Sequence, residues 1–111
     1  MNWKKYKTAL SNEHCQGLVR LIEFILVKHP SESHEDKLFL AALAEVLQHL
    51  KAKLVDYRRH YNCTFTPVQS VAIECLLSQY ILPQVKQLGD FENRMLQMQT
   101  SIIKNYHLCQ E

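Results

Sequence analysis

Glycine and proline are scarce in this sequence, with two and three residues respectively among 111. An all-β protein needs many turn residues, so this scarcity argues against that class and favours few, long elements. The two glycines, Gly17 and Gly89, are too far apart to form a glycine-rich phosphate loop. The sequence therefore predicts a mainly helical protein without that kind of nucleotide-binding loop.

Closely spaced cysteine pairs and a signal peptide are also lacking. None of the four cysteines, Cys15, Cys63, Cys75 and Cys109, stands at CxxC spacing. The segment Met1–Lys7 carries lysines, but no apolar core follows it as a signal peptide would require. We therefore expect reduced thiols and a cytoplasmic location.

No apolar run in the sequence is long enough for a membrane span. The most apolar segment, Leu18–Val27, contains Arg20 and Glu23 and is far shorter than the ~20 residues that a bilayer requires. We interpret it as the buried face of a helix, and we expect no membrane partner. The net charge of +2 is too small to predict an acidic partner by itself.

Apolar residues at three- and four-residue spacing are present along the chain, and this spacing predicts helices. We expect the first helix over Asn2–His29, ended by the proline that follows it. Residues 8–12 include poor helix formers, so a break there would leave a short separate helix at the N-terminus. The second helix is expected from a cap at Ser31 or Ser33 to about Tyr61.

The second half of the chain carries clearer boundary signals. A loop over 62–65 leads to Thr66-Pro67-Val68-Gln69, the pattern of a capping box with proline in the first turn of a helix. Pro83 predicts a kink near 79–82 in this third helix. Gly89 fits a left-handed position, and Asp90 is expected to cap the fourth helix. Short connections favour antiparallel neighbours, so we predict an all-α, up-down-up-down four-helix bundle that forms a single domain over 1–111.

Sequence signatures of catalysis are missing. The chain has neither GxSxG nor HExxH, and its six histidines form no close ligand pair. Cys63, beside Arg59 and His60, is the only thiol with reactive surroundings, although an ordinary loop thiol is the favoured interpretation. We therefore predict no catalytic residue, no cofactor and no metal site, and we rank an enzyme without a recognisable motif third among the functions.

Protein–protein contact or self-association, including a homodimer, ranks first. Every residue from Leu38 to Ala44 is apolar, which predicts either a central helix or an association face. The candidate interface has four residues: Leu38, Leu40, Ala41 and Ala44.

Nucleic-acid binding ranks second and depends on two basic stretches. The candidate residues are Lys4, Lys5, Lys7, Lys51, Lys53, Arg58, Arg59 and His60. Lysine and arginine neutralise phosphates, and neighbouring tyrosines could stack on bases. In an up-down bundle both stretches would meet at one pole. Against this hypothesis, cations suit a helix C-terminus, Tyr57 falls on the apolar stripe, and the isoelectric point is only about 8.4.

Overall fold

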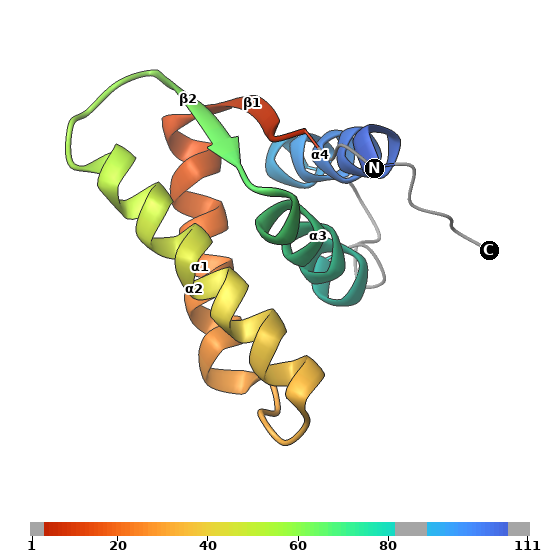
Figure 1. The fold of residues 1–111 in the computed structure, drawn as a ribbon. Coiled ribbons are helices and arrows are strands. Elements are labelled where there is room, and N and C mark those ends of the chain that lie inside the picture. The colour runs from red at the N-terminus through yellow and green to blue at the C-terminus, as the bar shows by residue number, and fades with distance from the viewer. Residues whose placement is uncertain (1–3, 82–88, 107–111) are drawn as a thin grey trace. The chain divides into compact units, whose positions relative to one another are not determined.

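The computed structural model describes residues 4–81 and 89–106 (Figure 1). Its elements, in chain order, are β1 (Tyr6–Ser11), α1 (Asn12–Lys28), α2 (His34–Leu54), β2 (His60–Phe65), α3 (Pro67–Leu76), the π-helical turn η1 (Leu77–Ile81) and α4 (Asp90–Tyr106).

The prediction of an all-α fold is wrong, because β1 and β2 pair as a two-stranded antiparallel sheet. Residues 6–11 were expected in the first helix or in a break within it, and residues 60–65 at the end of the second helix and in a loop. Both segments are strands instead. The up-down-up-down bundle inferred from four long helices is therefore overturned as well.

Contacts between residues divide the chain into two compact units. The hairpin unit is Ala9–Cys63. The terminal unit is Met1–Thr8 together with Thr64–Glu111. Each strand of the sheet belongs partly to one unit and partly to the other. The assignment of 1–111 to one domain stays a prediction, and the two units are described separately.

Strand β2 alternates strictly between exposed and buried residues. Tyr61, Cys63 and Phe65 are buried, while the residues between them are exposed. This two-residue period is that of a strand with one face in the core. β1 shows the same burial at Tyr6 and Leu10.

In the hairpin unit, α1 begins where a serine satisfies its free N–H groups. Ser11 Oγ accepts a hydrogen bond from the N–H of His14 at 3.1 Å, so Ser11 is the cap and Asn12 is the first helical residue. The helix ends at Lys28, just before Pro30, as the sequence predicts. Its buried stripe packs the helix into the core of the unit: Cys15, Leu18, Val19, Ile22 and Ile25.

The connection from α1 to α2 is fixed by two polar contacts. Ser33 caps α2 through a reciprocal pair of bonds with Asp36, which confirms one of the two predicted caps. Asp36 Oδ1 also lies 2.9 Å from Nε2 of His29, the residue that follows α1. The hydrogen bond from His29 lowers the pKa of the Asp36 carboxyl, and the bonds with Ser33 add to the effect.

The apolar run of α2 is divided between the two sides of the helix. Leu38 is 71% exposed and Ala41 is exposed, while Leu40 and Ala44 are half-buried. At 100° per residue, Leu38 and Leu40 point to nearly opposite sides. The four residues of the candidate interface therefore do not share one face of the helix, and their role as an interface stays a prediction.

In the terminal unit, α3 begins as its sequence predicts. Thr66 Oγ1 accepts from the N–H of Gln69 at 3.2 Å, Gln69 Oε1 accepts from the N–H of Thr66 at 3.0 Å, and Pro67 is the first helical residue. The α-helical hydrogen bonding of α3 ends at Leu76, and η1 begins at Leu77. The change in helix type thus starts two residues before the segment 79–82, in which the kink is predicted. Pro83 itself lies outside the described residues.

Helix α4 packs against α3 and η1 within the terminal unit. Gly89, rather than Asp90, occupies the cap position, since its C=O accepts from the N–H of Asn93 at 2.9 Å and its N–H donates to Glu92 Oε1 at 3.1 Å. The left-handed position predicted for Gly89 is wrong, because its φ lies outside that range. The buried face of α4 includes Met95, Met98, Ile102 and Tyr106.

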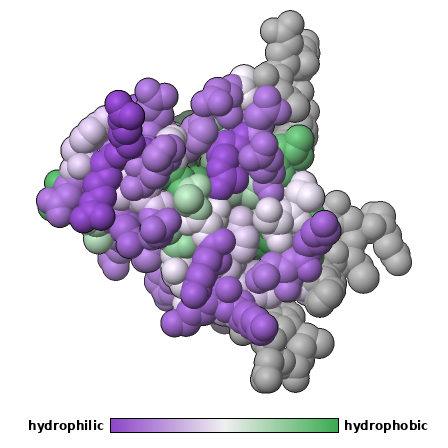
Figure 2. All heavy atoms as spheres, turned by 90° about the horizontal axis from the view of Figure 1, so that it is seen from above, coloured by the Kyte–Doolittle hydropathy of each residue, from purple (hydrophilic) through white to green (hydrophobic). Residues whose placement is uncertain are grey.

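Polar contacts join α4 to α3 and η1. Gln99 Nε2 donates to Ser78 Oγ at 2.9 Å, and the hydroxyl of Tyr106 donates to Ser70 Oγ at 3.4 Å. Within 4–81 and 89–106, no helix combines the length and hydropathy that crossing a membrane requires. On the face shown in Figure 2, hydrophilic side chains cover most of the surface and apolar areas are small.

Candidate functional site

The terminal unit contains an open hollow of about 890 Å³ between the start of the chain and the last turns of α4. We call it the lysine hollow. Its lining residues are Lys4, Lys5, Tyr6, Lys7, Ser101, Lys104 and Asn105. Four of these side chains are cationic, and none of the described lining residues is a carboxylate. The hollow therefore suits an anion.

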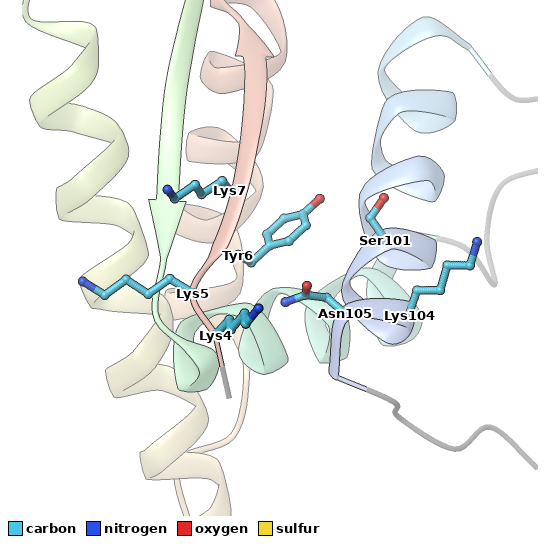
Figure 3. A pocket seen from close by; sticks show the side chains of 7 residues that line it. All are labelled: Lys4, Lys5, Tyr6, Lys7, Ser101, Lys104 and Asn105. Atoms are coloured by element: carbon cyan, nitrogen blue, oxygen red, sulfur yellow. The ribbon is translucent and has the colours of Figure 1, made fainter. Parts of the chain in front are cut away.

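The side chains of the lysine hollow differ in direction (Figure 3). Tyr6 and Lys4 lie on the side of the chain that faces α4, and Asn105 points toward them. Lys5 and Lys7 extend from the opposite side, as alternation along an extended chain requires. The lysines therefore do not converge on one point, and Lys5 and Lys7 point away from α4.

A hydrogen bond links β1 to α4 within the terminal unit. Arg94 donates from Nη2 to Thr8 Oγ1 at 2.7 Å. Tyr6 is buried and lines the hollow with Ser101 and Asn105. Residues 4–8 thus run alongside α4 in the direction opposite to it, which brings Lys4 to the end of α4 that carries Lys104.

Charge is separated along α4. Asp90 and Glu92 occupy its first turn, where carboxylates suit the helix dipole, and Lys104 lies in its last turn. Twelve residues separate Glu92 from Lys104, or about 18 Å at 1.5 Å per residue. This distance exceeds the ~8 Å Debye length at physiological salt, so those acids screen the lysine hollow weakly.

The hairpin unit has a smaller hollow of about 300 Å³ beside the connection from α2 to β2. We call it the loop hollow. Its lining residues are Ala52, Lys53, Asp56, Arg58, His60, Tyr61 and Asn62. Three of them are cationic or can become so, but Asp56 offsets part of that charge. The loop hollow is therefore a weaker anion site than the lysine hollow.

The hydroxyl of Tyr61 fixes the shape of the connection from α2 to β2. It accepts from the N–H of Arg58 at 3.0 Å and donates to the C=O of Asp56 at 2.8 Å. It also accepts from Asn12 Nδ2 at 2.9 Å. One buried oxygen thus joins the loop to the start of α1.

We expect Tyr61→Phe to lower the free energy of unfolding by about 1–3 kcal/mol, because the change removes three hydrogen bonds of the hydroxyl while keeping the buried ring. Tyr57→Phe is the control, since Tyr57 is 79% exposed and its ring lies in solvent. Urea unfolding followed by circular dichroism measures both variants. Equal stability of the two variants would show that the hydroxyl of Tyr61 contributes nothing to folding.

The predicted cations fall into both units. Lys4, Lys5 and Lys7 line the lysine hollow, and Lys53, Arg58 and His60 line the loop hollow. Neither hollow's described lining includes Lys51 or Arg59. Lys51 Nζ instead pairs with Glu23 Oε2 at 3.0 Å, and the C=O of Arg59 accepts from the N–H of Asn12. The single basic pole was inferred from the up-down bundle, so it stays a prediction without that basis.

Tyr57 was placed on the apolar stripe of the second helix by its spacing, and this placement is wrong. Helix α2 ends at Leu54, and the side chain of Tyr57 is 79% exposed. Its ring stands next in sequence to two exposed arginines, Arg58 and Arg59. One of the arguments against a nucleic-acid role is thereby removed.

The described thiols are poorly suited to nucleophilic chemistry. Burial raises the pKa of Cys15 to about 11, with a further contribution from the charge of Cys63. Burial also raises the pKa of Cys63, which lies in β2 and not in a loop, and Lys53 opposes this only in part. Burial and Glu74 raise the pKa of Cys75. These thiols are protonated at neutral pH, and a protonated thiol is a weak nucleophile.

The lining residues of the candidate site that the sequence did not indicate come from α4. Ser101, Lys104 and Asn105 line the lysine hollow about 95 residues after the lysines of the N-terminal segment, and no local pattern connects the two segments. Among the described residues, no three His, Cys, Asp or Glu side chains gather as ligands for a metal ion.

Comparison with known proteins gives no relative for this chain. No protein-family model, no curated protein and no solved structure matches it.

Proposed function

We propose that this protein binds nucleic acid through its phosphate backbone, and that the lysine hollow is the main contact surface. The observation that carries the proposal is the lining of that hollow, where four lysines stand with Ser101 and Asn105 and without a described carboxylate. Ammonium groups neutralise phosphates, and hydroxyl and amide groups donate to phosphate oxygens.

The spacing of the lysines supports a polymer with repeated charges as the ligand. Lys5 and Lys7 are two residues apart on an extended chain, which places them about 7 Å apart. Lys4 directly precedes Lys5, and Lys104 of α4 also lines the hollow. The spacing of Lys5 and Lys7 is within the ~8 Å Debye length, so these two charges act together on a polyanion.

The mode of binding follows from the surrounding residues. Tyr6 is buried, so it offers no free ring face for stacking on a base. Contacts from lysine, serine and asparagine to phosphates carry no direct sequence information. We therefore propose binding without sequence preference. In the hairpin unit, the exposed Tyr57 beside Arg58 supports a secondary contact in which a base stacks on the ring.

The proposed setting is the cytoplasm, where Cys15, Cys63 and Cys75 would stay reduced as the free thiols they are. Contact with another protein remains a second proposal, and its form as self-association is developed below.

A titration of labelled oligonucleotides tests the proposed function. Fluorescence anisotropy with a single-stranded and a duplex probe of about 20 nucleotides should give binding that weakens steeply with salt. Four phosphate contacts predict a single-strand slope of about −2.8 in log K against log salt, or roughly a 50-fold loss between 50 and 200 mM. Polyglutamate as a competitor controls for charge alone. Absence of binding, or affinity that does not respond to salt, would overturn the proposal.

A further inference from the structure

Helix α1 has a second organised face, opposite to the one that it buries. Phe24 is 57% exposed and Val27 is 79% exposed, although both are large apolar side chains. At helical spacing the same side also carries Glu13, Gly17, Arg20 and Lys28. We call these six residues the outer stripe of α1. Neither of the hollows described above includes any of them.

Gly17 is the unusual member of the outer stripe. Glycine in the middle of a helix weakens it, and here it lies six residues into a 17-residue helix. Its neighbours one turn away in either direction, Glu13 and Arg20, are long polar residues. A glycine between them leaves a gap on the surface of the helix, and such a gap allows a side chain of another helix to approach closely.

Four members of the outer stripe form two pairs that are symmetric about one point. The midpoint between Gly17 and Phe24 in the sequence is also the midpoint between Glu13 and Lys28, and it falls between Arg20 and Leu21. A two-fold axis through this point would bring each residue opposite its counterpart on a second, antiparallel helix. It would place Phe24 of one helix opposite Gly17 of the other, and Glu13 opposite Lys28.

We propose that the outer stripe of α1 binds α1 of a second copy of this chain as an antiparallel two-fold dimer. Phe24 of each copy packs over Gly17 of the other, and Glu13 of each copy pairs with Lys28 of the other. The stem of Arg20 covers Leu21 across the axis and leaves its guanidinium in water. A closed two-fold contact of this kind is isologous, so one surface supplies both sides.

Charge complementarity is the reason for choosing a second copy as the occupant. Glu13 and Lys28 lie 15 residues apart, or about 22 Å along the helix, with the apolar residues between them. A parallel arrangement would set like charges against each other at both ends, which is unfavourable. A single pair of helices buries less than the 1,200–2,000 Å² of a standard interface, so the dimer is expected to be weak.

Sedimentation equilibrium up to about 1 mM protein tests the dimer. We expect the wild type to associate and Phe24→Ala to weaken association at least about tenfold. Glu13→Lys and Lys28→Glu alone should each prevent association, because each sets like charges opposite one another. Lys37→Glu, an exposed change on α2, is the control and should leave the dimer intact.

The decisive experiment is sedimentation equilibrium of a mixture of the two charge variants. An equimolar mixture of Glu13→Lys and Lys28→Glu should form a heterodimer, because both end pairs are again complementary. Each variant is also measured alone. Association that appears only in the mixture therefore cannot come from a change in the folding of either variant. Circular dichroism confirms that both variants keep their helices. A wild type that stays monomeric at every concentration, or a mixture that does not associate, would overturn the proposal.

Discussion

Replacing Phe65 with alanine is expected to lower the free energy of unfolding by about 3–5 kcal/mol. Phe65 ends β2 with its side chain fully buried, and it is the largest fully buried side chain among the described residues. The loss combines the lost transfer of the ring from water with the cavity that remains. Total stabilities of small proteins are about 5–15 kcal/mol, so this single change removes a large part of the stability.

Thr64→Ala is the matched control for Phe65→Ala. Thr64 precedes Phe65 in the same strand but is exposed on the opposite face. We expect it to cost less than about 1 kcal/mol, the span of strand propensities. Chemical denaturation of both variants measures the difference. Similar costs for the two would contradict the strand, because a loop over 62–65 imposes no alternation between neighbours.

Removing the three N-terminal lysine charges is expected to have the largest effect on binding. Lys4, Lys5 and Lys7 replaced together by glutamine should weaken binding of single-stranded nucleic acid at least about tenfold at 50 mM salt. The salt slope should become shallower by about 2, since each lost phosphate contact removes about 0.7. All three lysines are exposed and lie outside the helices, so the helix content of the triple variant should equal that of the wild type.

A second triple variant separates the site from net charge. Lys28, Lys37 and Lys51 replaced by glutamine remove the same number of charges from the hairpin unit, outside the described lining of both hollows. We expect this variant to keep most of its affinity and its salt slope. Equal losses in the two triple variants would mean that overall charge, and not the lysine hollow, governs binding. Arginine at positions 4, 5 and 7 should retain binding, because the charges remain.

Helix boundaries were predictable where the chain carries a complete local signal. Ser33 and Thr66 each stand three residues before a side chain that returns the hydrogen bond, and Pro67 favours the first helical turn. Pro30 likewise marks the end of α1. Such signals depend on neighbours within four residues, so a sequence contains them in full.

The strands were missed because their spacing admits two interpretations. Tyr6 and Leu10 are four residues apart, which suits one face of a helix as well as one face of a strand. β2 carries a clearer signal, because Tyr61, Cys63 and Phe65 alternate with polar residues. The predicted second helix nevertheless runs to about Tyr61 and so covers the first residues of this strand. Pairing between segments about 50 residues apart depends on tertiary contacts that no local pattern expresses.

The candidate site was predictable only in part. The clustered lysines near the N-terminus are visible in the sequence, and the structure adds Lys104, Ser101 and Asn105 from the far end of the chain. Their grouping depends on β1 lying beside α4, which Arg94 and Thr8 help to fix. The single basic pole stays a prediction, because it was derived from the connectivity of an all-α bundle and the two strands contradict that fold class.

The most direct test of nucleic-acid binding is a titration of ¹⁵N-labelled protein with a short single-stranded oligonucleotide, followed by amide shifts in NMR spectra. Binding at the lysine hollow predicts that the largest changes group at residues 4–7 and 101–105, with smaller ones at 57–60. Changes confined to the turn between α1 and α2, or no changes at concentrations up to about 1 mM, would contradict it.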